Sequence, residues 1–205
     1  MPRYGKIQIY TGDGKGKTTA SLGLALRTVG QGGKVYIIQY MKGGAYTGEL
    51  ISIKNFLPKI EMIQFGRGCV KEKKQMKLLG IGEKAKYFDF IREDIECGTC
   101  RYCFLNDQEQ AKYVRSAFAL TQKLTNSSEY DLIVLDEINV ALKLGFLSVE
   151  EVLEMMDKKY KNTELIMTGR DAHPQVMEKA DLVTEMKLVK HYFDKGTSAR
   201  RGIEY

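Results

Sequence analysis

The sequence of 205 residues contains no tryptophan, only two histidines and no long apolar run. Its longest apolar runs, such as residues 132–135 (Leu-Ile-Val-Leu), are far too short to cross a bilayer, which excludes membrane-spanning helices. No apolar core of a secretion signal precedes the first predicted strand. His173 and His191 lie too far apart in sequence to suggest a pair of metal ligands. Together these absences predict a cytoplasmic protein.

The charge balance indicates a solvated surface rather than a nucleic-acid-binding one. There are 32 basic and 26 acidic residues, which give a net charge of +6 at pH 7. Basic runs such as residues 71–74 (Lys-Glu-Lys-Lys) are interrupted by acidic residues, and no Lys-rich or Arg/Gly-rich tail is present. We therefore expect charged helix faces and one basic phosphate site. An apolar content of 43% suits a single domain spanning residues 1–205.

Predicted strands and helices alternate along the chain, which is typical of an α/β fold with a mostly parallel central sheet flanked by helices. We expect strands at residues 6–11, 34–40, 60–65, 132–135, 164–168 and 181–186. We expect helices at residues 17–29, 106–124 and from 148 onward. Asn106 with Glu109, and Ser148 with Glu151, have the spacing of a capping box at a helix start. Residues 66–105 are predicted to be an irregular, Cys-rich insertion with one short helix near 87–92.

A glycine-rich loop follows the first predicted strand and leads into the first predicted helix. Its residues are Gly12, Asp13, Gly14, Lys15, Gly16, Lys17, Thr18 and Thr19. Backbone N–H groups of such a loop bind phosphates, while Lys17 contacts the phosphate chain and the Thr18 hydroxyl ligates Mg²⁺. Lys15 adds a second cation. This order of strand, loop and helix predicts a P-loop NTPase-like fold.

The spacing of this loop departs from the standard P-loop. Four residues normally separate the first glycine from the Gly-Lys pair. Counting back from Gly16 places Thr11 at that position, and Gly12 comes one residue late. The loop therefore indicates a nucleoside triphosphate site more clearly than it indicates an ordinary ATPase.

Two other predicted strands end in charged residues that belong at the same edge of a parallel sheet. The strand at 132–135 is followed by Asp136 and Glu137, and carboxylates at this place in P-loop proteins hold Mg²⁺ or orient a nucleophile. We expect Glu137 to be the metal ligand. The strand at 164–168 is followed by Arg170, for which a second phosphate contact and an ordinary surface position both stay open.

The four cysteines suggest a metal site. Cys97, Cys100 and Cys103 form a C-x₂-C-x₂-C run, and Cys69 would complete a tetrahedral set of thiolates. Zinc, an iron–sulfur cluster and thiols without metal all stay open. The proline that follows the last cysteine of a ferredoxin-type run is missing, because Phe104 stands there. Disulfides are not expected in a reducing compartment.

Several motifs occur in one order along the chain. They are residues 12–20 (GDGKGKTTA), 135–138 (LDEI), 168–170 (TGR), 180–186 (ADLVTEM), 190–191 (KH) and 202–204 (GIE). In this combination the chain closely resembles the P-loop ATP:corrinoid adenosyltransferases, which act on cob(I)alamin or cob(I)yrinic acid a,c-diamide. The resemblance covers residues 6–40 and 130–205. Its most specific parts are the shortened loop and the C-terminal tail.

The resemblance implies a transferase of adenosylcobalamin biosynthesis or salvage. In this family the reduced Co(I) of a corrinoid attacks the 5′ carbon of ATP and the whole triphosphate leaves, with ATP held in the loop in a reversed sense. By the family's pattern Lys17 and Glu137 serve catalysis, while Thr18 and Glu137 hold Mg²⁺ or Mn²⁺. The nucleotide site then extends beyond the loop to Arg170, Lys190 and His191.

The same resemblance implies two partners, a second copy of the chain in a homodimer and a flavoprotein-like electron donor that reduces Co(II). Two departures concern the corrinoid side. Better-known members carry a Phe and a Trp just after the third strand that ease reduction of Co(II), whereas this chain reads FGRGCV at residues 65–70 and has no Trp. Those members also lack the Cys-bearing insertion. We hypothesise that this insertion folds over the corrinoid and that a bound metal orders it.

Two other classes of protein stay open. A nucleoside kinase of the thymidine kinase type shares the P-loop, the Asp-Glu strand end and zinc-binding cysteines, but it has standard loop spacing and two C-x₂-C pairs. A nucleic-acid-binding P-loop ATPase with a zinc module fits the positive charge and the cysteines. Against it, the sequence has no RNP-like aromatic pattern and no C₂H₂ spacing.

Overall fold

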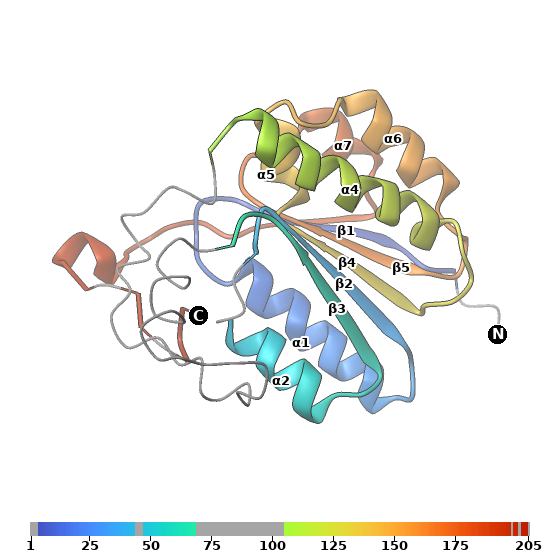
Figure 1. Cartoon of the computed structure of the whole chain (residues 1–205), viewed down its shortest axis with the longest axis horizontal. Coiled ribbons are helices and arrows are strands. Elements are labelled where there is room, and N and C mark those ends of the chain that lie inside the picture. Colours follow the sequence, from blue (N-terminus) through green and yellow to red (C-terminus); the bar gives the residue numbers. More distant parts are fainter. Residues whose placement is uncertain (1–3, 44–46, 69–104, 198, 201, 205) are drawn as a thin grey trace.

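The computed structural model describes residues 4–43, 47–68, 105–197, 199–200 and 202–204. These residues form an α/β fold in which a central sheet lies between two layers of helices (Figure 1). The strands are β1 (Ile7–Thr11), β2 (Val35–Tyr40), β3 (Ile60–Phe65), β4 (Leu132–Asp136), β5 (Glu164–Thr168) and β6 (Leu182–Glu185). They pair in the order β3-β2-β4-β5-β1-β6, and every pair is parallel. The predicted P-loop-like α/β fold is confirmed.

Helices cover both faces of the sheet (Figure 1). One face carries α1 (Lys17–Gly30) and α2 (Gly48–Phe56), and the other carries α4 (Gln108–Thr125), α5 (Ile138–Lys143), α6 (Val149–Lys158) and α7 (Pro174–Lys179). A 3₁₀ helix, η3 (Tyr192–Lys195), lies apart from the sheet near the C-terminus. All five residues of β4 are buried. The cover on both faces explains why this strand is apolar throughout rather than alternating.

The predicted strands are all present, with bounds that differ by no more than one residue. The predicted helices at 17–29 and from 148 onward are present as α1 and α6. The predicted capping box of α6 is confirmed, because Glu151 N–H donates to Ser148 Oγ at 3.1 Å and Ser148 N–H donates to Glu151 Oε2 at 2.8 Å.

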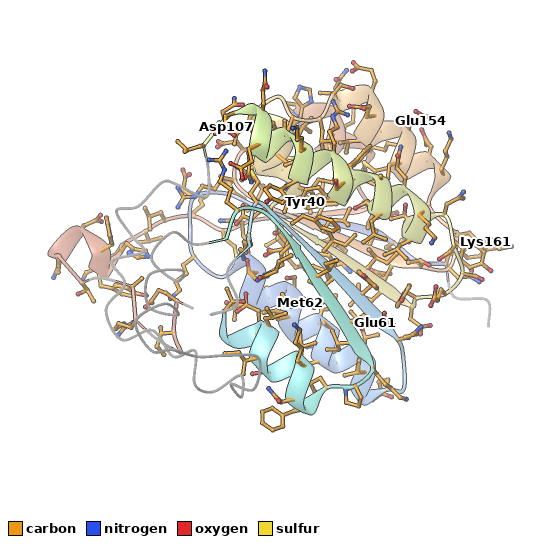
Figure 2. All side chains as sticks on the ribbon, viewed as in Figure 1. Tyr40, Glu61, Met62, Asp107, Glu154 and Lys161 are labelled. Carbon is orange, nitrogen blue, oxygen red and sulfur yellow. The ribbon has the colours of Figure 1, made fainter. Side chains whose placement is uncertain are left out.

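The N-cap of α4 differs from the prediction. Asp107 caps the helix, and its carboxylate accepts a hydrogen bond from the Gln110 N–H at 3.0 Å. Asn106 instead donates from Nδ2 to the carbonyl oxygen of Leu144 at 3.0 Å. An ionised carboxylate is a stronger acceptor than an amide and is favoured by the positive end of the helix. The prediction of Asn106 as the cap is therefore wrong by one residue; Figure 2 labels Asp107 at this end of α4.

Sequence reasoning missed α2, α5 and α7, which contain 9, 6 and 6 residues. Segments this short hold too few turns for a helical period to stand out. The helix predicted near 87–92 and all four cysteines lie outside the described residues.

The carboxyl end of β2 is fixed by a buried tyrosine. Tyr40 is fully buried between the sheet and α4, where its hydroxyl shares a hydrogen bond of 2.6 Å with Thr121 Oγ1 (Figure 2). Because all the strands are parallel, the segments that follow β1, β2, β4 and β5 begin at the same edge of the sheet. The residues predicted to bind a nucleotide come from this edge.

Candidate functional site

The glycine-rich loop joins β1 to α1, and two of its glycines cannot be replaced without a clash. Gly12 has φ +92°, and a Cβ there would lie 2.5 Å from the carbonyl oxygen of Met186. A Cβ on Gly14 would lie 2.6 Å from the same oxygen, to which the Gly14 N–H donates at 2.7 Å. The loop thus packs on the backbone that follows β6, and only glycine permits that approach.

Thr11 accounts for the shortened loop. It is the last residue of β1, it is buried, and its hydroxyl accepts a hydrogen bond from the Ala172 N–H at 3.1 Å. Its carbonyl oxygen accepts a hydrogen bond from the Met186 N–H at 2.8 Å. The strand therefore continues through the position of the first glycine of a standard P-loop, and the turn begins at Gly12.

Helix α1 directs its N-terminus at the loop. Gly16 caps the helix in the left-handed conformation at φ +112°, and the first turn contains no acidic residue. The N–H groups and positive partial charge of this turn therefore favour an anion. The ammonium of Lys17 donates to the carbonyl oxygens of Gly12 and Gly14 at 2.6 and 2.7 Å. Burial lowers the pKa of Lys17.

Asp136 is the centre of a buried hydrogen-bond network at the end of β4. Its Oδ1 accepts hydrogen bonds from the hydroxyls of Thr18 at 2.8 Å and Thr168 at 2.7 Å. Its Oδ2 accepts from Gln39 Nε2 at 3.0 Å and from the ammonium of Lys42 at 2.7 Å. Burial opposes ionisation of this carboxyl, but the charge of Lys42 and the hydrogen bonds outweigh it and lower the pKa of Asp136. Asp136 thereby fixes the Thr18 hydroxyl.

Glu137 has a different environment from its neighbour. It stands at the N-cap of α5 with φ +66°, and its N–H donates to Thr168 Oγ1 at 3.0 Å. Burial and the adjacent Asp136 raise the pKa of Glu137. Its carboxylate forms no hydrogen bond or ion pair with any residue that the structure describes, and it lines the same cavity as Thr18. The acidic pair is thus divided, since Asp136 supports Thr18 from within the sheet while Glu137 faces the cavity.

A cavity of about 810 Å³ lies over the carboxyl edge of the sheet. The predicted site residues that line it are Asp13, Gly14, Lys15, Gly16, Lys17, Thr18, Thr19, Glu137, Arg170 and His191. Gly12, the first residue of the loop, packs against Met186 instead, and Lys190 is exposed beside His191. The structure therefore brings together side chains as far apart in the sequence as Asp13 and His191, which are 178 positions apart.

Sequence reasoning missed three charged residues of this cavity, Lys42, Glu49 and Asp194. Lys42 follows β2 after one intervening residue, Met41, and Glu49 lies in the first turn of α2; both side chains line the cavity. Gln39 Nε2 joins them, since it donates to Glu49 Oε1 at 3.0 Å and to Asp136. Lys42 could have been found, because a charged residue just past a strand belongs to the same edge as the loop after β1. Glu49 could not, because α2 itself was not predicted.

The fold and the site define a class of protein. A glycine-rich loop at the head of α1, with a carboxylate at the end of the parallel strand β4 opposite Thr18, is the arrangement of a P-loop nucleotide-binding protein. Among the described residues, no three side chains of the His, Cys, Asp and Glu types are grouped closely enough to hold a metal ion by themselves. No helix in the described part of the chain is long and apolar enough to cross a membrane.

Comparison with known proteins identifies the family. The family model for ATP:corrinoid adenosyltransferase BtuR/CobO/CobP matches residues 3–106 and 76–205. The corrinoid adenosyltransferase of Escherichia coli K12 is 31% identical over 98% of this chain and 86% of its own length. That of Pseudomonas aeruginosa is 30% identical over 98% of this chain and 84% of its own length. The chain belongs to the ATP:corrinoid adenosyltransferase family and is a transferase. The kinase and nucleic-acid-binding alternatives find no support in these comparisons.

Proposed function

We propose that this protein transfers the 5′-deoxyadenosyl group of ATP to the Co(I) of a corrinoid and releases inorganic triphosphate, in adenosylcobalamin biosynthesis or salvage. One observation carries the proposal: the likeness to corrinoid adenosyltransferases extends over 98% of the chain, and most of the motif residues predicted to bind ATP surround one cavity. ATP is supplied in the cytoplasm, where we place the reaction.

The chemistry needs no nucleophile or base from the protein. The electron pair of Co(I) forms the new bond to the 5′ carbon of ATP. The bond from that carbon to the triphosphate oxygen breaks, and its electron pair leaves with the triphosphate, so that the cobalt becomes Co(III). The protein positions the two substrates and neutralises the leaving group. Lys17 and Arg170, which both line the cavity, would face the triphosphate.

We propose that Thr18 and Glu137 hold Mg²⁺ or Mn²⁺. The donor set fits, because Mg²⁺ binds oxygen ligands and needs only one or two protein groups when substrate phosphates supply the rest. The Thr18 hydroxyl donates its proton to Asp136 at 2.8 Å, which directs its lone pairs away from that carboxylate. A bound ion would stabilise charge on the leaving triphosphate. Since the pKa of Glu137 is raised, metal affinity should fall as the pH is lowered.

The partners and the cysteine region are further parts of the proposal. A homodimer, as the family resemblance implies, would have twice the 23.3 kDa mass of one chain in light scattering. A flavoprotein-like donor would reduce Co(II) before the transfer. Within one domain of residues 1–205, we propose that the insertion at 66–105 binds zinc or an iron–sulfur cluster. The ligands would be Cys69, Cys97, Cys100 and Cys103. Stoichiometric zinc or iron in anaerobically purified protein would support this site, and the absence of both would contradict it.

An anaerobic assay with ATP and chemically reduced cobalamin tests the transfer. We expect equal amounts of a light-sensitive Co–C product and inorganic triphosphate. ADP and phosphate alone would contradict the proposal. Thr18→Val should weaken Mg²⁺ binding by at least about tenfold. Thr28→Val is a matched control, because among the described residues that hydroxyl bonds only to the Leu24 carbonyl oxygen on the same helix.

A further inference from the structure

The C-terminal segment, described at residues 190–197, 199–200 and 202–204, returns to the glycine-rich loop. The ammonium of Lys15 donates to Glu204 Oε1 at 2.5 Å and to the Tyr192 hydroxyl at 2.8 Å. A longer contact of 3.4 Å reaches the carbonyl oxygen of Ile203. The second cation of the loop, which the sequence predicts to be a phosphate ligand, is therefore engaged by the end of the chain.

Glu204 gathers these contacts on one carboxylate. Besides Lys15, it accepts hydrogen bonds from the Tyr192 hydroxyl and from the Arg200 N–H, the latter at 2.6 Å. The Arg200 guanidinium lies over the Tyr192 ring, 4.7 Å from its centroid. Only 15% of the Glu204 side chain is exposed. Burial alone would raise the pKa of Glu204, but the hydrogen bonds from Lys15, Tyr192 and Arg200 lower it far more. The carboxylate is therefore ionised throughout the neutral range.

This contact lies in the wall of the cavity. His191, Phe193, Ile203 and Glu204 line the same cavity as Lys15 and the rest of the loop. Among the described residues, the hydrogen bonds that join this segment to the loop all come from the Lys15 ammonium, which reaches Tyr192, Ile203 and Glu204. Release of Glu204 would therefore move one wall of the cavity relative to the phosphate-binding turn.

We propose that Glu204 is a positioning residue, which acts through Lys15 to hold the C-terminal segment against the phosphate-binding loop. In this arrangement Lys15 places the segment rather than adding full charge to the phosphate site, and Lys17 carries the contact with phosphate. The roles of Lys15 and Lys17 at the phosphate site rest on the proposed function. The contact itself does not, since it joins two parts of the protein and can be measured without substrate.

Hydrogen exchange of a peptide covering residues 190–204, measured on the whole protein without nucleotide, tests the contact. Glu204→Gln and Lys15→Met should each speed exchange in this peptide about tenfold, because hydrogen bonds between charged groups are lost. The double variant should exchange no faster than either single variant. Glu178→Gln, on an exposed face of α7, is the matched control and should change nothing.

The outcomes separate this proposal from the proposed function. Unchanged exchange in Glu204→Gln, or additive effects in the double variant, would overturn it, whether or not the enzyme turns over. If exchange rises as expected, Glu204→Gln should raise the KM for ATP about tenfold while the melting temperature stays within the range of the control. Tyr192→Phe removes the hydroxyl that contacts both Lys15 and Glu204, with the least disturbance to folding. This variant should also speed exchange in the same peptide.

Discussion

Replacement of Lys42 by methionine would leave a buried carboxylate without its cation. The ammonium of Lys42 lies 2.7 Å from Asp136 Oδ2, with 25% of the lysine side chain and 1% of the aspartate side chain exposed. Methionine keeps an unbranched apolar stem only one atom shorter, and it removes the ammonium with its charge and its hydrogen-bond donor. The variant therefore isolates the ion pair from the packing around it.

The expected loss of stability follows from this burial. Removal of one partner from a buried ion pair costs about 3–5 kcal/mol. Asp136 would retain the hydrogen bonds from Thr18, Thr168 and Gln39, so we expect the lower end of that range. A loss of about 3 kcal/mol corresponds to a fall of about 6–12 °C in melting temperature for a chain of this size.

The pH dependence of the loss has a defined sign. In the wild type the pKa of Asp136 is lowered, so its contribution to stability is complete above the unfolded value of about 3.9 and is lost as the pH falls through the lower folded value. Without Lys42, burial is opposed only by uncharged hydrogen bonds and should raise the pKa of Asp136. Such a carboxyl destabilises the fold increasingly as the pH rises above about 4. The difference in unfolding free energy between the variant and the wild type should therefore become smaller from pH 8 to pH 5.

Thermal unfolding followed by circular dichroism between pH 5 and pH 8 measures this difference in stability. Lys143→Met is the matched control, because it breaks a pair of 2.6 Å with Asp171 whose side chains are 55% and 51% exposed. An exposed pair contributes at most about 1 kcal/mol. The stabilising role of the Lys42–Asp136 pair is refuted if Lys42→Met loses no more stability than Lys143→Met. It is also refuted if the difference in stability from the wild type becomes larger as the pH is lowered.

Three other substitutions have defined expectations. Ser148→Ala should cost about 1 kcal/mol in urea unfolding through loss of the α6 cap, and an unchanged midpoint would contradict the capping role. Gly12→Ala, at φ +92° and 2.5 Å from the Met186 carbonyl oxygen, should cost more than about 1 kcal/mol and abolish ATP binding in calorimetry; normal binding would refute the close-packed loop. Lys159→Met removes an ammonium that donates to three carbonyl oxygens at 2.7–3.1 Å and should cost about 1–3 kcal/mol in unfolding free energy. A loss no larger than that of Lys143→Met would contradict this expectation.

The sheet and the glycine-rich loop could be predicted because their signals are local. Each strand is a short apolar run between polar residues, and the loop is one uninterrupted motif that begins at Gly12. The departure in spacing could be read from the loop, but its cause could not, because Thr11 is held in the strand by its pairing with Glu185 and its bond to Ala172. The same reasoning failed at Asn106, where two adjacent residues could both cap a helix and only the folded chain decides between them.

The partners of the charged residues could not be predicted, because they are distant in sequence. Lys42 meets Asp136 across 94 positions, and Lys15 meets Glu204 across 189 positions. The pattern at the end of the chain did mark Glu204 as part of a motif. Nothing in that motif indicates that its carboxylate binds the loop, so the pairing required the three-dimensional structure.

These pairings divide the cations of the cavity into two groups. Lys42 and Lys15 are each bound to a carboxylate of the protein, and those bonds fix Asp136 and the C-terminal segment. Lys17 and Arg170 form no ion pair within the part of the chain that the structure describes. A triphosphate that leaves during transfer gains negative charge, and cations whose charge is not already balanced by a protein carboxylate stabilise that gain most. Loss of the charge at Lys17 or Arg170 should therefore slow transfer itself, whereas loss at Lys42 or Lys15 should first change stability, metal binding or the position of the cavity wall.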